Sequence, residues 1–285
     1  MTVDHRARIL VTADGLAREL AAPSPPVVLA IRNTQPGGTP TYRGEPRIPG
    51  AVDVELPAEL AGAPSRHGGA RPLPAIAELQ RHARRWGLRR DSRVVVYDHD
   101  RCLVAARAWW VLRWAGIADV RMLDGGFARW LAAGLPIVAA SPSPTAGDVE
   151  LTAGHLPQID ADAAAQMARK AVLLDSRIRP NYIGGAVPAG QAPRGHIPGA
   201  VSAPAADNLG DDGTFTDAGT LAALYGALGA DGTGPVAVYC GVGISATHDI
   251  AALAIIGIEA ALFCGSWSAW SSDPARPVAI GARPG

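Results

Sequence analysis

The sequence repeats itself, because short segments of its first half recur in the same order in its second half. Four pairs of segments carry the repeat: 28–32 (VLAIR) and 173–177 (LLDSR), 48–51 and 197–200 (both IPGA), 94–97 (VVVY) and 236–239 (VAVY), and 125–130 (GGFARW) and 265–270 (GSWSAW). The paired segments lie 140 to 149 residues apart, so insertions between the copies are small. This pattern predicts a tandem duplication of one folding unit.

The length of the chain fits two such units. The chain has 285 residues, whereas domains of about 100 to 150 residues are the commonest size. Residues 139–147 (AASPSPTAG) are rich in proline and serine, a composition that is typical of a linker. We therefore predict a first domain at residues 1–139, a linker at 140–150 and a second domain at 151–285.

Short apolar runs in both halves predict the strands. They lie at residues 27–31, 94–97, 172–174 and 236–239, and most of them lack a strict alternation of polar and apolar side chains. Runs of this kind suit strands that are buried on both faces. Helical patterns separate the runs, so we expect an α/β fold in which each repeat forms a small, mainly parallel sheet with helices on both faces.

One cysteine directly follows a predicted strand. Cys240 comes after residues 236–239, and a helical pattern at 246–256 follows a few residues later. Between them lie five small or apolar residues: Gly241, Val242, Gly243, Ile244 and Ser245. Backbone N–H groups of such a loop and of a helix N-terminus favour the anionic form of a sulfur atom. A thiolate is a nucleophile, so the segment predicts covalent chemistry at Cys240.

Composition argues against several other kinds of function. The chain carries 26 basic and 26 acidic residues, a balance that gives no sign of nucleic-acid or membrane-surface binding. No apolar run indicates a membrane span, and the charged N-terminal segment lacks the apolar centre of a signal peptide. Three widely spaced cysteines (Cys102, Cys240 and Cys264) argue against a disulfide framework or a metal cluster. We expect a cytoplasmic protein without a metal or an organic cofactor.

The segment from 235 to 270 resembles the active-site segment of the rhodanese-type sulfurtransferases, in which a strand, a cysteine, a loop around it and a helix follow one another. Residues 265–267 (GSW) and 273–278 (DPARPV) are similar to the C-terminal segments of the two-domain thiosulfate and 3-mercaptopyruvate sulfurtransferases. The resemblance covers nearly the whole chain. It implies two rhodanese-like domains in tandem and a Cys240 that carries the transferred sulfur as a persulfide.

The resemblance also implies where a sulfur donor binds. The loop from Gly241 to Ser245 surrounds the sulfur, and its glycines at 241 and 243 match the mercaptopyruvate-type enzymes. Arg194 corresponds to a family arginine proposed to hold the mercaptopyruvate carboxylate, a task that suits a guanidinium group. Asn181 stands where the family usually has a second donor-binding arginine, and Val242 where the mercaptopyruvate-type enzymes commonly have serine. The chain therefore departs from the family pattern at two positions.

The first repeat lacks the nucleophile. Tyr97 aligns with Tyr239, so Asp98 stands where Cys240 stands in the second repeat. The loop of small residues is also lost, since residues 99–102 read HDRC. We expect the first domain to be non-catalytic and, as the resemblance implies, to supply part of the wall of the active site.

We interpret the chain as a sulfurtransferase that moves a sulfane sulfur from a small anionic donor, 3-mercaptopyruvate or thiosulfate, to a thiol or cyanide acceptor. The residues above favour 3-mercaptopyruvate slightly. A thioredoxin-like reductant is a further candidate partner.

Two other functions share the fold. Cysteine phosphatases need an arginine six residues after the cysteine to hold the phosphoryl oxygens, and Ala246 stands there, which argues against them. A non-catalytic or weakly active rhodanese-like protein that carries sulfur or binds a partner is the stronger alternative, because Asn181 and Val242 depart from the family pattern. The reactivity of Cys240 at neutral pH discriminates this alternative from an enzyme.

Overall fold

The computed structural model describes residues 4–34, 44–185 and 194–285. Its contacts divide the chain into two units. The first unit comprises Met1–Gly62, Leu73–Leu156 and Asp211–Thr214; the second comprises Ala63–Pro72, Pro157–Gly210 and Phe215–Gly285. One short segment of each half is thus grouped with the other unit, and residues 140–150 fall in the first unit. The domain boundaries given above stay a prediction.

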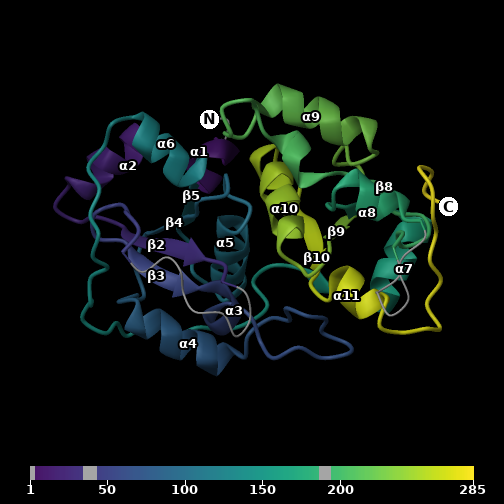
Figure 1. Cartoon of the computed structure of the whole chain (residues 1–285), viewed down its shortest axis with the longest axis horizontal. Helices are drawn as coiled ribbons and strands as arrows, with labels where there is room; N and C mark the ends of the chain where they lie inside the picture. Colours follow the sequence, from purple (N-terminus) through teal and green to yellow (C-terminus); the bar gives the residue numbers. More distant parts are fainter. Residues whose placement is uncertain (1–3, 35–43, 186–193) are drawn as a thin grey trace. The chain divides into compact units, whose positions relative to one another are not determined.

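The first unit is built around a parallel sheet of five strands in the order β1-β5-β4-β2-β3. Figure 1 labels four of them: β5, β4, β2 and β3. The strands are β1 (Leu10–Val11), β2 (Val27–Arg32), β3 (Val52–Glu55), β4 (Val94–Tyr97) and β5 (Val120–Leu123). Its helices are α1 (His5–Ile9), α2 (Ala13–Leu20), α3 (Leu56–Glu59), α4 (Ile76–Arg85), α5 (Ala105–Trp114) and α6 (Gly126–Ala132).

The second unit repeats this plan, with a parallel sheet in the order β6-β10-β9-β7-β8. The strands are β6 (Gln158–Ile159), β7 (Val172–Asp175), β8 (Val201–Ser202), β9 (Val236–Tyr239) and β10 (Ala260–Phe263). The helices are α7 (Ala161–Lys170), α8 (Arg179–Ile183), the 3₁₀ helix η1 (Ala205–Asn208), α9 (Ala218–Ala227), α10 (Ser245–Ile255) and α11 (Ser266–Trp270).

Alternate side chains of each central strand face opposite layers of helices. In the second unit, Ala237 and Tyr239 of β9 pack in one cluster with apolar residues of α7 and α11. Helix α10 packs against β9 and β10 and also contacts α9. Both sheets are therefore covered on two faces, which confirms the predicted α/β fold and explains why the strands read as continuous apolar runs.

The duplication extends to single hydrogen bonds. The Tyr97 hydroxyl accepts a hydrogen bond from the backbone N–H of Ile48 at 3.2 Å, and the Tyr239 hydroxyl accepts one from Ile197 at 3.1 Å. Both tyrosines end the central strand of their sheet. The predicted tandem repeat is confirmed.

Residues 63–72, which the sequence places in the first half, lie against the second unit. The backbone N–H of Ala70 donates to the Ser268 hydroxyl at 3.0 Å. Gly69 comes so close to this unit that an added Cβ would lie 2.4 Å from the carbonyl oxygen of Gly265, and its φ of 75° is left-handed. A glycine is therefore required at this point of contact.

Candidate active site

Cys240 follows the last residue of β9, a strand that lies between β7 and β10 in the sheet. Its thiol is free, and the residue is 1% exposed. The position at the carboxyl end of a central parallel strand is the place where sheets of this kind bind their ligands. Both the position and the free thiol agree with the sequence-based prediction; the catalytic role itself stays a prediction.

The loop after Cys240 closes around the sulfur. The backbone N–H of Gly243 donates to the Cys240 sulfur at 3.1 Å. Gly243 has a φ of 76°, a left-handed conformation that glycine adopts without strain. Helix α10 then begins at Ser245, so its N-terminus follows the loop directly. A fixed N–H donor and a helix N-terminus both favour negative charge on sulfur.

The predicted loop residues differ in exposure. Gly243 is buried, whereas Gly241, Val242, Ile244 and Ser245 are half-buried. Half-buried loop residues around a buried sulfur can face a small ligand, and their binding role remains a prediction.

Ser266 contributes a second group to the site that the sequence analysis did not single out. Its hydroxyl accepts a hydrogen bond from the backbone N–H of Cys240 at 3.1 Å and donates to the carbonyl oxygen of Phe263 at 2.9 Å. The hydroxyl oxygen lies 3.9 Å from the Cys240 sulfur. Ser266 has a φ of 52°, which is left-handed and unusual for a residue with a side chain. The serine is thus held in a strained backbone next to Cys240.

Asp175 and Arg177 form a buried ion pair beside the site. Asp175 is fully buried at the end of β7, and Arg177 donates from Nε and Nη2 to its carboxylate at 2.9 and 2.5 Å. Arg177 also donates to the carbonyl oxygen of Gly195 at 2.6 Å and lies over the ring of Trp267 at 4.4 Å. These contacts occupy the guanidinium group within the protein, which agrees with a structural role for the pair.

The two predicted donor-binding residues lie near each other but are not bonded to Cys240 among the described residues. Asn181 is half-buried in α8, and its carbonyl oxygen accepts from the backbone N–H of Gly195 at 3.3 Å. Arg194, the residue before Gly195, is exposed and forms a bridge with Gly185. Their role in binding a donor stays a prediction.

In the first repeat, a carboxylate occupies the position of the sulfur. Asp98 follows β4 as Cys240 follows β9, and its two oxygens accept from the backbone N–H groups of four loop residues at 2.7 to 2.9 Å: Asp100, Cys102, Val104 and Ala105. Burial raises the pKa of Asp98, although these four hydrogen bonds act to lower it. The first repeat therefore keeps the anion-binding loop and fills it with a fixed side chain, as expected for a copy without the nucleophile.

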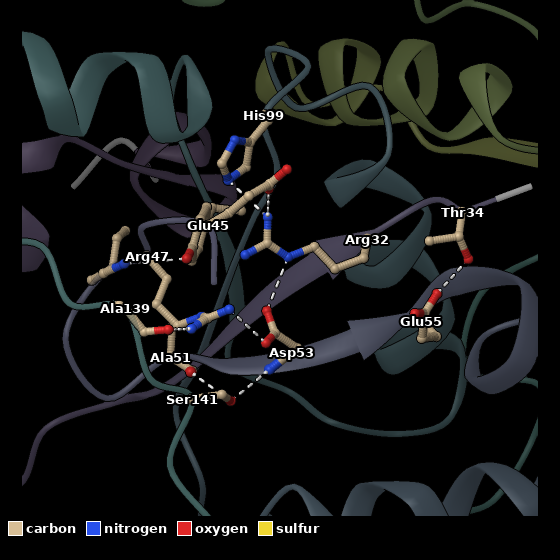
Figure 2. A network of polar contacts seen from close by, with 12 residues as sticks. Arg32, Thr34, Glu45, Arg47, Ala51, Asp53, Glu55, His99, Ala139 and Ser141 are labelled. Carbon is tan, nitrogen blue, oxygen red and sulfur yellow. Dashed lines mark hydrogen bonds and ion pairs between the residues drawn. The ribbon is translucent and has the colours of Figure 1, made fainter. Parts of the chain in front are cut away.

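A charged network lies in the same unit as Asp98. Asp53 lies between the side chains of Arg32 and Arg47 (Figure 2). Both arginines are buried, and the Asp53 carboxylate lies 2.9 Å from Arg32 and 3.0 Å from Arg47. Arg32 also contacts Glu45 at 3.2 Å and His99 at 2.9 Å. Arg32 has the position of Arg177 in its repeat, because Ala30 pairs with Tyr97 as Asp175 pairs with Tyr239. The two repeats thus neutralise the equivalent arginine with different carboxylates.

None of the helices in residues 4–34, 44–185 and 194–285 combines the length and apolar character of a membrane span. Within the same residues, no three His, Cys, Asp or Glu side chains form a group that could hold a metal ion.

Known proteins that are similar to this chain contain rhodanese-like domains or are named as sulfurtransferases. The model of the rhodanese-like domain matches it twice, at residues 16–133 and 160–273. The protein SseB of Mycobacterium tuberculosis, whose name gives thiosulfate sulfurtransferase as a provisional activity, is 44% identical over 283 residues, which cover 97% of this chain and 98% of SseB. A Pseudomonas aeruginosa protein, named provisionally as a 3-mercaptopyruvate sulfurtransferase, is 40% identical over 282 residues, 95% of this chain and 98% of that protein.

A solved structure shares the architecture. SseA from Escherichia coli, described as a 3-mercaptopyruvate sulfotransferase, has a TM-score of 0.77 and 26% sequence identity. The match covers 91% of this chain and 98% of SseA. Each of the two regions that match the rhodanese-like domain contains four strands of one sheet, and β1 and β6 lie just before them.

Proposed function

Since the chain belongs to the rhodanese family of sulfurtransferases, we propose that it transfers a sulfane sulfur from a small anionic donor to a thiol or cyanide acceptor through a persulfide on Cys240. The domain at residues 151–285 then carries the nucleophile. The observation that carries the proposal is the Gly243 N–H, which donates to the Cys240 sulfur at 3.1 Å in a loop that leads into α10.

The reaction divides into two displacements at sulfur. The Cys240 thiolate attacks the outer sulfur of the donor; a sulfur–sulfur bond forms, and the bond between that sulfur and the rest of the donor breaks. Thiosulfate leaves as sulfite, whereas 3-mercaptopyruvate leaves as pyruvate, whose methyl carbon takes up the thiol proton. An acceptor thiolate or cyanide then attacks the outer sulfur of the persulfide and restores the Cys240 thiolate. The loop N–H and the helix N-terminus stabilise the anionic sulfur before and after the first step.

The choice of donor depends on residues near the loop. We favour 3-mercaptopyruvate slightly, because Gly241, Gly243 and Arg194 match the enzymes of that type. Arg194 is exposed and would hold the donor carboxylate, which a guanidinium group binds through two hydrogen bonds. Asn181 and Val242 bring neither a charge nor a hydroxyl group to the site. Of the two relatives described above, one is named for thiosulfate and the other for 3-mercaptopyruvate, so the donor requires a direct test.

The physiological acceptor is a thiol, and a thioredoxin-like reductant is a candidate for it. The compartment in which the protein works is the cytoplasm. Three free cysteines support a reducing compartment, since none of them is paired in a disulfide among the described residues.

The test is thiocyanate formation from cyanide with thiosulfate and 3-mercaptopyruvate in parallel. We expect turnover with at least one donor, and its loss in Cys240→Ser. Cys264→Ser serves as the matched control, because Cys264 is also buried and outside any disulfide but contacts the carbonyl oxygen of Arg71 at 3.6 Å. Turnover that persists in Cys240→Ser would exclude a mechanism through a persulfide on Cys240.

A sulfur carrier without turnover is the second candidate, because Asn181 and Val242 stand where the family has groups that act on the donor. In that case one equivalent of sulfur would load onto Cys240 and remain there when cyanide is added, which mass spectrometry of the intact protein would detect.

A further inference from the structure

A chain of buried polar side chains runs beside α10 in the second unit. The Tyr225 hydroxyl, on α9, donates to the Asn208 side-chain oxygen at 2.9 Å. The Asn208 side-chain nitrogen donates to the Asp249 carboxylate at 2.8 Å, and the Ser176 hydroxyl donates to the other oxygen of that carboxylate at 2.5 Å. All four residues are at most 3% exposed. Asp249 thus accepts hydrogen bonds on both oxygens inside the protein.

Asp249 connects the two backbone segments that flank the nucleophile. On one side, its partner Ser176 donates from the backbone N–H to the carbonyl oxygen of Tyr239 at 2.9 Å, and Tyr239 directly precedes Cys240. On the other side, Asp249 lies one turn after Ser245, the residue at which α10 begins beyond the Cys240 loop. The carboxylate therefore links the strand end before Cys240 to the helix after it.

The non-catalytic repeat builds the same fold without this pair. In both repeats an equivalent backbone hydrogen bond closes the turn after the helix: the N–H of Ile117 donates to Leu112 at 3.0 Å, and that of Ile258 donates to Leu253 at 2.9 Å. This correspondence places Ala108 opposite Asp249. The sheet register, in which Ala30 pairs with Tyr97 as Asp175 pairs with Tyr239, places Ile31 opposite Ser176. Ile31 and Ala108 are buried, so the fold accepts apolar side chains at both positions.

A buried carboxylate carries a cost that an apolar pair avoids, because transfer of a charge from water into the interior is unfavourable. Burial raises the pKa of Asp249 to about 7; the hydrogen bonds from Ser176, Asn208 and Tyr225 act to lower it, and the charge of Asp175 acts to raise it. A costly group that is present only in the repeat with the nucleophile indicates a role at the nucleophile.

Other titratable groups surround the carboxylate. On α10, the neighbouring His248 stacks on Phe215 at 4.4 Å and has its Nδ1 3.2 Å from the Asn208 side-chain nitrogen. On β7, the charge of Asp175 is paired with Arg177. On α9, burial raises the pKa of Tyr225 well above its ordinary value, and Asp207 on η1 acts in the same direction.

We propose that Asp249 is a positioning residue of the Cys240 site: its ionised carboxylate, bound by Ser176, holds the first turn of α10 against the end of β7 and so keeps the Gly243 N–H directed at the Cys240 sulfur. The inference deepens the proposed function, since it assumes that Cys240 is the nucleophile. In the ionised state both oxygens of Asp249 accept hydrogen bonds. When Asp249 is protonated, the oxygen that faces Ser176 becomes a donor, the Ser176 hydroxyl can only accept from it, and the hydrogen bond is no longer strengthened by a charge. The positioning therefore weakens as the pH falls through the range in which Asp249 titrates.

The test measures the rate at which iodoacetamide alkylates Cys240, in a chain with Cys102→Ser and Cys264→Ser so that one thiol remains. The thiolate fraction is measured in the same samples from its ultraviolet absorbance, with Cys240→Ser as the blank. Dividing the rate by the thiolate fraction removes the titration of Cys240 itself. The remaining pH dependence reports the positioning of the loop.

In the otherwise unaltered protein, we expect the rate per thiolate to fall about tenfold as the pH falls through about 7, the loss expected when a hydrogen bond to a charged group becomes a weaker bond to a neutral one. Asp249→Asn should make the rate independent of pH. Ser176→Ala should lower the rate above pH 7 to the acid value, because it removes the link and keeps the bond between Asp249 and Asn208. Asp98→Asn is the matched control: it removes a buried carboxylate from the other repeat and should leave the pH dependence of the alkylation in place.

A pH step that persists in Asp249→Asn, or wild-type rates at all pH values in Ser176→Ala, would overturn the proposal. If Asp249→Asn does not fold, Ser176→Ala decides alone. Alkylation requires no sulfur donor, so the result stands apart from the thiocyanate assay, and failure of the proposed function would be recognised separately.

Discussion

Gly126 and Ser266 occupy the same place in the two repeats, and both have a left-handed backbone, with φ of 62° and 52°. Each directly precedes an aromatic residue, Phe127 or Trp267, whose backbone N–H donates to the carbonyl oxygen of Asp98 or Cys240 at 2.8 and 2.9 Å. The repeat without the nucleophile has the residue that suits this backbone. The other repeat has a serine, whose hydroxyl accepts a hydrogen bond from the Cys240 N–H. Backbone strain is therefore retained at the position where a side chain contacts Cys240.

Replacing Ser266 by glycine should therefore separate stability from reactivity. We expect Ser266→Gly to unfold at the same temperature as the wild type or a higher one, because relief of the left-handed strain, worth about 1 kcal/mol, offsets the lost hydrogen bonds. Alkylation of Cys240 should slow several-fold, since the Cys240 N–H loses its acceptor. Thermal unfolding and alkylation kinetics measure the two effects. A stable variant with an unchanged alkylation rate would exclude a role for the hydroxyl at the sulfur.

Replacing Gly243 by alanine should lower both the stability of the protein and the reactivity of Cys240. The φ of 76° is unfavourable for alanine by about 1 kcal/mol, and a backbone that relaxes to relieve this strain withdraws its N–H from Cys240. We expect lower stability in urea unfolding together with slower alkylation. Gly241→Ala is the control, because an added Cβ at Gly241 meets no atom within 4 Å. Equal effects of the two substitutions would contradict a specific role for the Gly243 conformation.

The pair of Asp175 and Arg177 gives a prediction about stability alone. Arg177→Leu leaves the fully buried Asp175 carboxylate without its partner, so we expect a loss of about 3 to 5 kcal/mol in the free energy of unfolding. Adding Asp175→Ala, the residue type that the first repeat has at Ala30, should restore part of this loss. Urea unfolding of the two single variants and the double variant measures the coupling. Strictly additive losses would show that the two side chains do not depend on each other.

Asp249 predicts a characteristic pH dependence of stability. Its pKa is raised to about 7 in the folded protein, so folding favours the protonated form. The stabilisation is fully present below the pKa of the unfolded chain and is lost as the pH rises between about 4 and 7, by about 4 kcal/mol in all. Asp249→Asn should lack this contribution. The free energy of unfolding of the wild type minus that of Asp249→Asn should therefore decrease over this range and stay constant above it. An increase with pH would contradict the assigned direction of the pKa.

Much of the fold was predictable from the sequence. The strands β4 and β9 were predicted with their observed bounds, and the helix predicted at 246–256 begins and ends one residue earlier in the structure. Six strands were not predicted: β3, β5, β8 and β10, and the edge strands β1 and β6. The last two show the reason most clearly. Each has two residues, too few for a periodic pattern, and each is stabilised by pairing with a strand more than 100 residues away in the sequence.

Only part of the candidate site was predictable, again because some of its contacts join residues that are distant in the sequence. Cys240 and Gly243 are close in the sequence, and a strand, a glycine loop and a helix are local features. Asp249 stands in an apolar helix and depends on Ser176, 73 residues earlier, so its partner becomes evident only when β7 and α10 lie together. The strain at Ser266 lies in its backbone conformation, which the residue type does not reveal. The alignment of Ser266 with Gly126 was the one sign in the sequence of a left-handed position.

The four N–H groups that surround Asp98 have a consequence for how the two copies behave over time. Asp98 is covalently part of the chain, so this loop always contains the same carboxyl group. The Cys240 loop would instead surround a thiol, a thiolate and a persulfide in turn during each transfer. Duplication has thus left one copy of the loop permanently filled and the other with changing occupancy, so amide exchange should report the catalytic cycle at Gly243 and stay constant at Val104 and Ala105.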